Sequence, residues 1–226
     1  ATVTRAKRGY QTDPKYAWDP SKPIPYFFDP SMAASYIPLI RDGIAFWQNN
    51  TCLTFVEDPN GDSALRFYMG STCSASLGRQ GTKTQDVSIG SGCNNLGTVT
   101  HEIAHAIGFF HLMSSPNRDN VTSVNGLFVA QYFLVVREQR NSGRNEETIE
   151  RGNVPFKFQY SDAFATDNNI PTIVALNKWM QNTMGQRVAP AFSDIKMMNK
   201  AFKCDAKCTG KTCSNGGFPN SKDCTR

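Results

Sequence analysis

The sequence predicts an α+β fold with a large share of loop. Of its 226 residues, 39% are apolar and 19% are charged, which is enough apolar material for one globular domain with its own core. Seventeen glycines, twelve prolines and fifteen phenylalanines argue against a helical bundle, because glycine and proline interrupt long helices while aromatic side chains favour sheets. Stretches with strand-like alternation and stretches with helical spacing both occur, so we expect strands and helices together.

The N-terminal half of the chain contains the predicted sheet. Apolar residues at helical spacing predict a helix over 36–49 that packs on this sheet. Strands are predicted over 23–29, 53–57, 64–69 and 86–89. The segment 73–93 is rich in serine, threonine and glycine, which suggests a disulfide-closed loop that wraps a sheet edge.

A second helix is predicted over 96–110. Its inward-facing apolar stripe consists of Val99, Ile103, Ala106 and Ile107. This stripe leaves another face of the helix for chemistry, and Gly108 is placed to end the helix. Further on we expect a helix over 127–140, then a long irregular part, and from residue 208 a separate tail of small polar residues and cysteines.

Charge and hydropathy exclude two classes of function. The net charge of +5 is modest and its lysines and arginines are scattered, so the basic stripe of a nucleic-acid-binding protein is missing. No apolar run approaches the roughly 18 residues that a membrane span needs. We expect a monomer that has protein or peptide substrates, with no nucleic-acid partner and no membrane span.

Cysteine content indicates an oxidising compartment. Seven cysteines are many for this length and do not form a zinc ribbon, so disulfides and secretion are expected. Two N-glycosylation sequons, at Asn49 and Asn120, agree with an extracellular glycoprotein. The dibasic cluster over 5–8 indicates a zymogen cut before Gly9, with a solvated basic tail as the alternative.

All three histidines of the chain fall within eleven residues, as HEIAHAIGFFH from His101 to His111. On a helix, the spacing of four residues places His101 and His105 on one face, where their nitrogens can reach one ion at about 2.0–2.1 Å. Gly108 permits a positive φ, so the chain can turn and bring His111 back as third ligand. Three protein ligands leave a fourth position for water, which is typical of catalytic Zn²⁺.

Glu102 is the predicted proton carrier of this site. It lies too far around the helix to bind the ion beside His101, but it can reach a water there, take its proton and return it to the leaving amine. The alternative, ordinary core or surface histidines on an amphipathic helix, does not account for the glycine and third histidine at these offsets. The full H-E-x-x-H-x-x-G-x-x-H pattern is the metzincin signature.

Around this motif the sequence resembles the astacin family of zinc metalloproteases, from about residue 26 to residue 224. Matching segments are Trp47 with TCLTF (51–55), LGR (77–79), SIGSGC (88–93), GFFH (108–111) and RD (118–119). The resemblance implies a catalytic domain of two lobes. A twisted mixed sheet and the active-site helix would form the N-terminal lobe, and the C-terminal lobe would be mostly irregular.

The resemblance also implies disulfides and a substrate edge. The implied pairs are Cys52 with Cys204 and Cys73 with Cys93. The strand after Cys73 would be the edge on which an extended peptide lies. The tail looks like the first half of an EGF-like module, as in nematode-type astacins. In this truncated module Cys208 and Cys224 are the expected disulfide cysteines and Cys213 is unpaired, with an intermolecular disulfide as the alternative.

Two departures from the family pattern affect the expected site. Leu112 stands where astacins carry glutamate after the third histidine, and the family's Ser-x-Met-His-Tyr turn is shortened. The simplest alignment retains Tyr160 as the tyrosine beside the metal, with ordinary packing as the alternative. Methionines Met180, Met184, Met197 and Met198 are expected to fill the core rather than replace the missing methionine.

These observations predict a secreted zinc endopeptidase. We expect a propeptide remnant over 1–8, a catalytic domain over 9–205 and a truncated EGF-like segment over 206–226. The two lobes of the catalytic domain are expected at about 9–111 and 112–205. The competing interpretation is a zinc-binding but catalytically impaired relative that acts as a binding module, because its shortened turn leaves the site incomplete.

Overall fold

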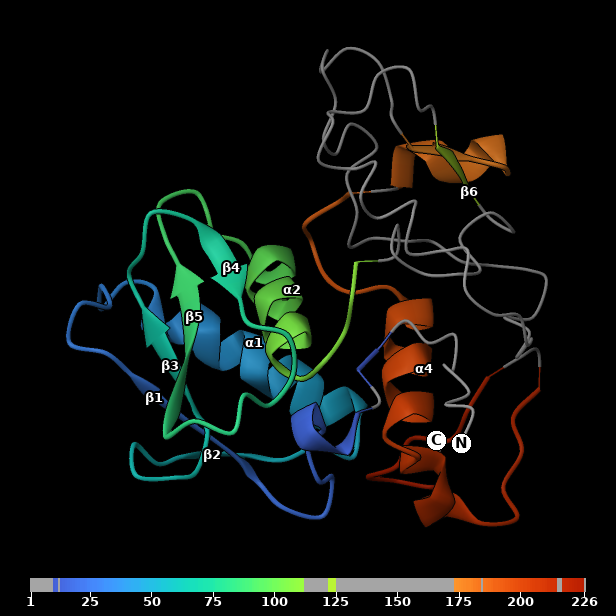
Figure 1. The fold of residues 1–226 in the computed structure, drawn as a ribbon. Helices are drawn as coiled ribbons and strands as arrows, with labels where there is room; N and C mark the ends of the chain where they lie inside the picture. The colour runs from blue at the N-terminus through green and yellow to red at the C-terminus, as the bar shows by residue number, and fades with distance from the viewer. Residues whose placement is uncertain are drawn as a thin grey trace, which may run out of the picture.

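A five-stranded mixed sheet forms the centre of the fold (Figure 1). The computed structural model describes residues 10–11, 13–111, 122–124, 173–183, 185–214 and 217–225. The strands are β1 (Ile24–Phe28), β2 (Phe55–Glu57), β3 (Ala64–Tyr68), β4 (Cys73–Ala75) and β5 (Thr84–Ile89). They lie in the order β2-β1-β3-β5-β4, all pairs being parallel except β4 with β5. The α+β class predicted from sequence is confirmed.

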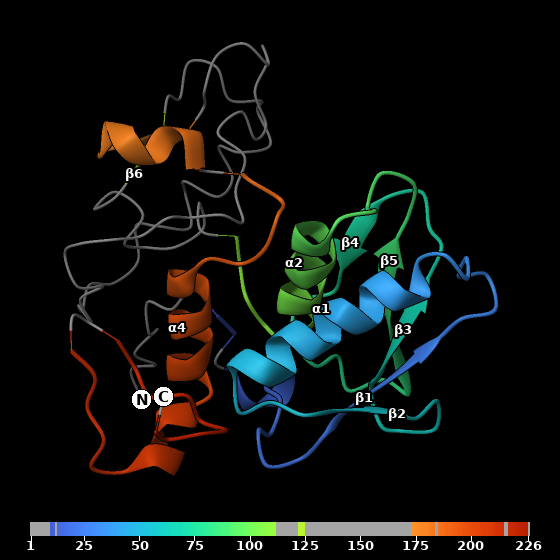
Figure 2. The same ribbon diagram turned by 180° about the vertical axis from the view of Figure 1, so that it is seen from behind.

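Two helices pack on one face of this sheet, as the two opposite views show (Figures 1 and 2). Helix α1 (Ile37–Asn50) and helix α2 (Leu96–Ala106) bury their apolar stripes against the strands. The central strand β3 contributes Leu65 and Phe67, both fully buried, to this core. Both helices and four of the five strands follow the segments predicted from hydrophobic spacing.

Close contact between α1 and α2 fixes the position of α2. A Cβ atom on Gly43 of α1 would lie only 2.7 Å from Val99 Cγ1 of α2, so glycine allows the two helices to approach. The indole Nε1 of Trp47 in α1 donates a buried hydrogen bond to Thr100 O of α2 at 3.0 Å. The sheet and α1 therefore hold α2 firmly in place, and α2 is a rigid support for the histidines that it carries.

Helix α4 (Phe192–Ala201) lies beside α2 in both views (Figures 1 and 2). Its first turn is stabilised by Asp194, whose Oδ2 accepts a hydrogen bond from the backbone N–H of Ala191 at 2.7 Å. This segment was expected to be irregular, so α4 corrects the sequence prediction. The helix predicted over 127–140 lies outside the described residues.

Shorter elements complete the described part of the fold. They are the 3-10 turns η1 (Pro14–Tyr16), η5 (Lys178–Thr183) and η6 (Cys204–Cys208), and the antiparallel pair β6 (Thr122–Val124) and β7 (Ile173–Ala175). Within the described ranges, no helix is long and apolar enough to cross a membrane.

Three disulfides cross-link the described part of the chain, and one of them joins residues 152 positions apart. They join Cys52 to Cys204, Cys73 to Cys93 and Cys208 to Cys224. The first two are the pairs that the family resemblance implies. The first connects the end of α1 to η6 after α4, and Asn199 reinforces this junction by donating to Asn50 O at 2.7 Å. Cys213 carries an exposed free thiol.

Candidate metal centre

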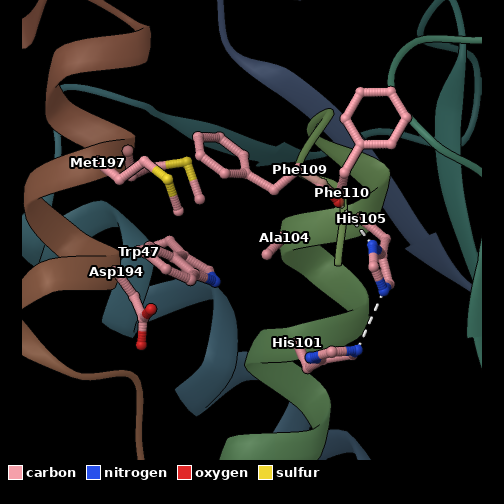
Figure 3. A pocket seen from close by; sticks show the side chains of 9 residues that line it. Trp47, His101, Ala104, His105, Phe109, Phe110, Asp194 and Met197 are labelled. Carbon is pink, nitrogen blue, oxygen red and sulfur yellow. Dashed lines mark hydrogen bonds between the residues drawn. The ribbon is translucent and has the colours of Figure 1, made fainter. Parts of the chain in front are cut away.

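Helix α2 presents two of the three histidines. Its N-cap is Asn95, whose Oδ1 accepts a hydrogen bond from the backbone N–H of Thr98 at 2.8 Å and so caps the first turn. One turn separates His101 from His105, and Figure 3 shows both rings projecting from the same side of α2. Their Nε2 atoms are 3.0 Å apart.

A glycine turn brings in the third histidine. Helix α2 ends at Ala106, and Gly108 has φ +111°, a conformation that favours glycine. The N–H of Gly108 donates to His105 O at 2.8 Å, and the N–H of Phe109 donates to Ala104 O at 2.9 Å. This turn redirects the chain, and His111 Nε2 then lies 3.2 Å from His101 Nε2 and 3.0 Å from His105 Nε2.

The spacing of the three nitrogens fits one zinc ion. Two ligands each about 2.0–2.1 Å from a tetrahedral Zn²⁺ lie about 3.3 Å apart, close to the observed separations. His105 Nδ1 lies 2.6 Å from Phe109 O, and because a carbonyl can only accept, Nδ1 carries the proton and Nε2 keeps its lone pair. Among the described residues, this is the group of histidine, cysteine or acidic side chains placed to hold a metal.

Burial keeps the three imidazoles neutral. It lowers the pKa of His101 well below its usual value, lowers the pKa of His105, and lowers the pKa of His111 to about 4. Neighbouring histidines and the positive charge of Arg187 act in the same direction on His101 and His111, whereas the bond to the Phe109 carbonyl raises the pKa of His105 and partly opposes burial. A histidine ring binds a metal only in its uncharged form, which keeps a nitrogen lone pair. The three imidazoles are therefore in the protonation state that a metal cation requires.

Glu102 is a buried acid beside this triad. Its exposed fraction is 4%, and burial raises its pKa to about 7, while the charge of Arg187 opposes this shift. A carboxyl group whose pKa lies near neutrality can both accept and release a proton at physiological pH.

A pocket opens between α2 and α4 next to the metal centre (Figure 3). Its walls are formed by Trp47, His101, Ala104, His105, Phe109, Phe110, Asp194, Met197 and Met198. Met198 is buried in the hydrophobic core, and the partly buried Met197 packs against this core. Both therefore fill the core as expected.

Other predicted residues fall outside the described part of the chain. Tyr160 and Leu112 are among them, and so are Met184 and the side chain of Met180.

Two groups at the site were not identified from the sequence. The first is the carbonyl of Phe109, which orients the second histidine; backbone groups carry no signal in a residue pattern. The second is Arg187, whose carbonyl accepts a hydrogen bond from Gly97 N–H at 2.9 Å and whose charge reaches the site. Arg187 is remote in sequence, so only the folded structure places it beside α2.

A mixed sheet, a helix with two histidines four residues apart and a glycine turn leading to a third histidine are the features of the metzincin class of zinc metalloproteases. Residues 10–203 match the family model described as astacin, a peptidase family. The chain belongs to the astacin family. The cofactor of this family is zinc.

Curated relatives agree with this assignment, and a solved structure shares the fold. The chain is 36% identical to zinc metalloproteinase nas-28 of Caenorhabditis elegans, over 98% of this chain and 45% of the relative. It is 32% identical to zinc metalloproteinase nas-36 of Haemonchus contortus, over 97% of this chain and 36% of the relative. The chain thus spans less than half the length of these relatives. The fold matches high choriolytic enzyme 1, a hatching enzyme zinc-protease from medaka (Oryzias latipes), with a TM-score of 0.67 and 23% identity over 80% of this chain and 88% of the other.

Proposed function

We propose that this chain is a secreted zinc-dependent endopeptidase that hydrolyses peptide bonds in extracellular proteins. The observation that carries the proposal is the triangle of Nε2 atoms, 3.0–3.2 Å on each side, beside a buried carboxyl group. Neutral imidazoles at this spacing suit a dication, and a three-ligand site is typical of catalytic rather than structural zinc.

The residues around the ion divide the chemistry among them. Zinc, when held by His101, His105 and His111, supplies a Lewis acid that activates a water molecule and polarises a carbonyl group. Glu102 takes the proton of the attacking water and delivers it to the leaving amine, a task that its pKa of about 7 suits. Phe109 O keeps the proton of His105 on Nδ1 and so keeps Nε2 available.

The substrate would lie along β4. This strand is the last in the sheet order and pairs with β5 on one side, so its other edge carries backbone groups able to pair with an extended peptide. Strand β4 also packs beside α2, the helix that carries His101 and His105. The proposal therefore assigns protein or peptide substrates.

A second candidate function follows from the shortened segment before Tyr160. An astacin-type domain that binds zinc but lacks an intact turn beneath the metal would act as a binding module with impaired catalysis. The motivating observation is the local sequence FKFQYSDAF over 156–164, which lacks the methionine and histidine of the family turn.

Localisation and organisation are parts of the same proposal. Three disulfides support an oxidising, extracellular compartment. We keep the division into a remnant of a propeptide over 1–8, a catalytic domain over 9–205 and a partial EGF-like segment over 206–226. The Cys208–Cys224 bond encloses most of that last segment. Monomeric state and glycosylation at Asn49 and Asn120 also remain predictions.

Peptide hydrolysis with controlled metal content tests the proposed function. The purified protein should cleave a quenched peptide, lose activity on removal of zinc by a chelator, and regain it when zinc is returned. Glu102→Gln should still bind one zinc per chain while its rate falls by about 10²–10⁴-fold, because only proton transfer is removed. His105→Ala should lose the zinc itself.

The outcomes separate the two candidates. A wild-type protein with one zinc and no hydrolysis would support the impaired binding module. A wild-type protein that binds no zinc would contradict both.

A further inference from the structure

Three separate segments meet at the C-terminal end of α2. One is the N-terminal strap, which we define as residues 10–11 and 13–18. Another is the loop 77–80, and the last is the turn that leads from α2 to His111. The end of a helix leaves carbonyl groups without helical partners, and these must be bonded by other groups.

The side chain of Trp18 forms a hydrogen bond with the last carbonyl group of α2. Its indole Nε1 donates to Ala106 O at 2.9 Å, in a buried contact between residues 88 positions apart. Trp18 itself is 8% exposed and belongs to the hydrophobic core. The indole therefore fixes the point at which the chain leaves the helix.

The start of the strap pairs with the turn itself. The backbone N–H of Gln11 donates to Gly108 O at 2.6 Å, and Tyr10 forms an antiparallel bridge with Phe109. The rings of Tyr10 and Phe109 stack with centroids 5.7 Å apart. Phe109 is also the residue whose carbonyl orients the His105 ring, so the strap holds a group that acts directly on a zinc ligand.

The loop 77–80 joins the strap to the helix. The N–H of Gly78 donates to His105 O at 2.9 Å, and the N–H of Arg79 donates to Tyr16 O at 2.8 Å. Gly78 has φ +71°, and a Cβ there would lie 2.6 Å from Tyr16 O, so glycine is required for this close contact. The three segments thus form one connected hydrogen-bonded junction.

We propose that the N-terminal strap is a positioning element for the zinc ligands, acting through the Trp18 indole and the backbone N–H of Gln11. This inference rests on the proposed zinc site. His111 is reached through a glycine turn, and glycine leaves the backbone free to adopt other conformations. The strap removes that freedom by bonding the carbonyls on both sides of the turn, at Ala106 and at Gly108. Groups that orient metal ligands from behind typically change metal affinity by about 10–100-fold when removed.

The sharper test uses Gln11. Proline at position 11 removes the N–H that Gly108 O accepts, and the extended bridge at Tyr10 suits the residue before proline. Gln11→Ala is the matched control, because it keeps the N–H and removes only the side chain. Zinc affinity of the metal-free protein, measured by competition with a chelator of known affinity, should fall about 10–100-fold in Gln11→Pro and stay at the wild-type value in Gln11→Ala.

A second pair of variants tests the other contact. Trp18→Phe keeps an aromatic side chain and removes the donor, whereas Val87→Ala shortens a fully buried side chain of β5, outside the strap. Both should lower the melting temperature, but only Trp18→Phe should weaken zinc binding and alter the visible absorption bands of the Co²⁺-loaded protein.

The outcomes are distinguishable from failure of the zinc site itself. Wild-type zinc affinity and Co²⁺ spectra in both Gln11→Pro and Trp18→Phe would overturn the positioning role. A wild-type protein without zinc would instead overturn the proposed function on which this inference rests.

Discussion

Glu102 owes its proposed role to its place on α2. Consecutive residues of a helix point about 100° apart, so Glu102 does not share the face on which His101 and His105 lie. Its side chain is buried, as that of His101 is, and burial raises the pKa of Glu102 to about 7. Because His101 and Glu102 are consecutive residues of α2, they point in different directions. The first is placed to bind the metal and the second to transfer protons.

Tyr160 gives a prediction at the residue scale. If it stands beside the metal, its hydroxyl stabilises the oxyanion that forms during attack, and such donors contribute about 2.7–4 kcal/mol to transition-state binding. We expect Tyr160→Phe to lower kcat by about 10²–10³-fold while KM changes little. Steady-state kinetics on the quenched peptide measure both constants.

The control for this experiment is Tyr36→Phe, at the start of α1, which should leave both constants unchanged. Equal kcat values for Tyr160→Phe and the wild type would remove Tyr160 from the mechanism.

At the scale of elements, the first turn of α2 packs directly on backbone. The N–H of Gly97 donates to Arg187 O, and a Cβ at Gly97 would lie 2.4 Å from the carbonyl carbon of Arg187. Backbone cannot rotate away as a side chain can, so α2 must shift if this position carries a larger residue.

Gly97→Ala should therefore destabilise the protein by about 1–3 kcal/mol. This loss is expected even though alanine is about 1 kcal/mol better than glycine inside a helix. Gly43→Ala is the comparison, because its Cβ would meet the side chains of Val99 and Ile103 rather than backbone, so it should be destabilised as well, but less than Gly97→Ala. Urea unfolding measures both variants, and a Gly97→Ala protein as stable as Gly43→Ala would contradict this account of the α2 contact.

Elements with regular hydrophobic spacing were predictable from the sequence. Helix α1 and strands β1, β3 and β5 lie within two residues of the predicted ranges, because each buries a face whose period is visible in sequence. Strand β4 was expected only as an edge after Cys73, since three residues carry too little pattern. Helix α4 was missed because polar residues interrupt its apolar positions, and its stability comes from packing and from the Asp194 cap.

The candidate site also has a part that could be predicted from the sequence and a part that could not. His101, Glu102 and His105 lie on one predicted helix, so helix geometry predicts how they are arranged, and Gly108 indicates the turn that leads to His111. The strap could not be predicted, because Trp18 meets Ala106 across 88 residues and Gln11 acts through its backbone. Contacts of this kind depend on tertiary packing and leave no local pattern.

At the scale of the whole molecule, the Cys52–Cys204 disulfide is expected to dominate stability. It closes a loop with a sequence separation of 152, whereas Cys73–Cys93 closes one of 20. The loop-entropy relation gives upper values of about 5 and about 3 kcal/mol for the two bonds. The pair Cys52→Ala and Cys204→Ala should therefore cost more stability than the pair Cys73→Ala and Cys93→Ala.

Denaturant unfolding of the two double variants under oxidising conditions provides the measurement. An equal or smaller loss for the long-loop pair would show that the chain end is held mainly by packing of α4, not by the covalent link.

The placement of the zinc ligands within the chain also has a consequence for the order of events during synthesis. The strap, the loop 77–80 and all three histidines precede residue 112, and domains are made from the N-terminus onward. A chain still on the ribosome thus carries every ligand and every group of the junction before Cys204 exists. The residues of the proposed metal site therefore lie in the part of this domain that is made first, whereas the long disulfide can close only after Cys204 has been made.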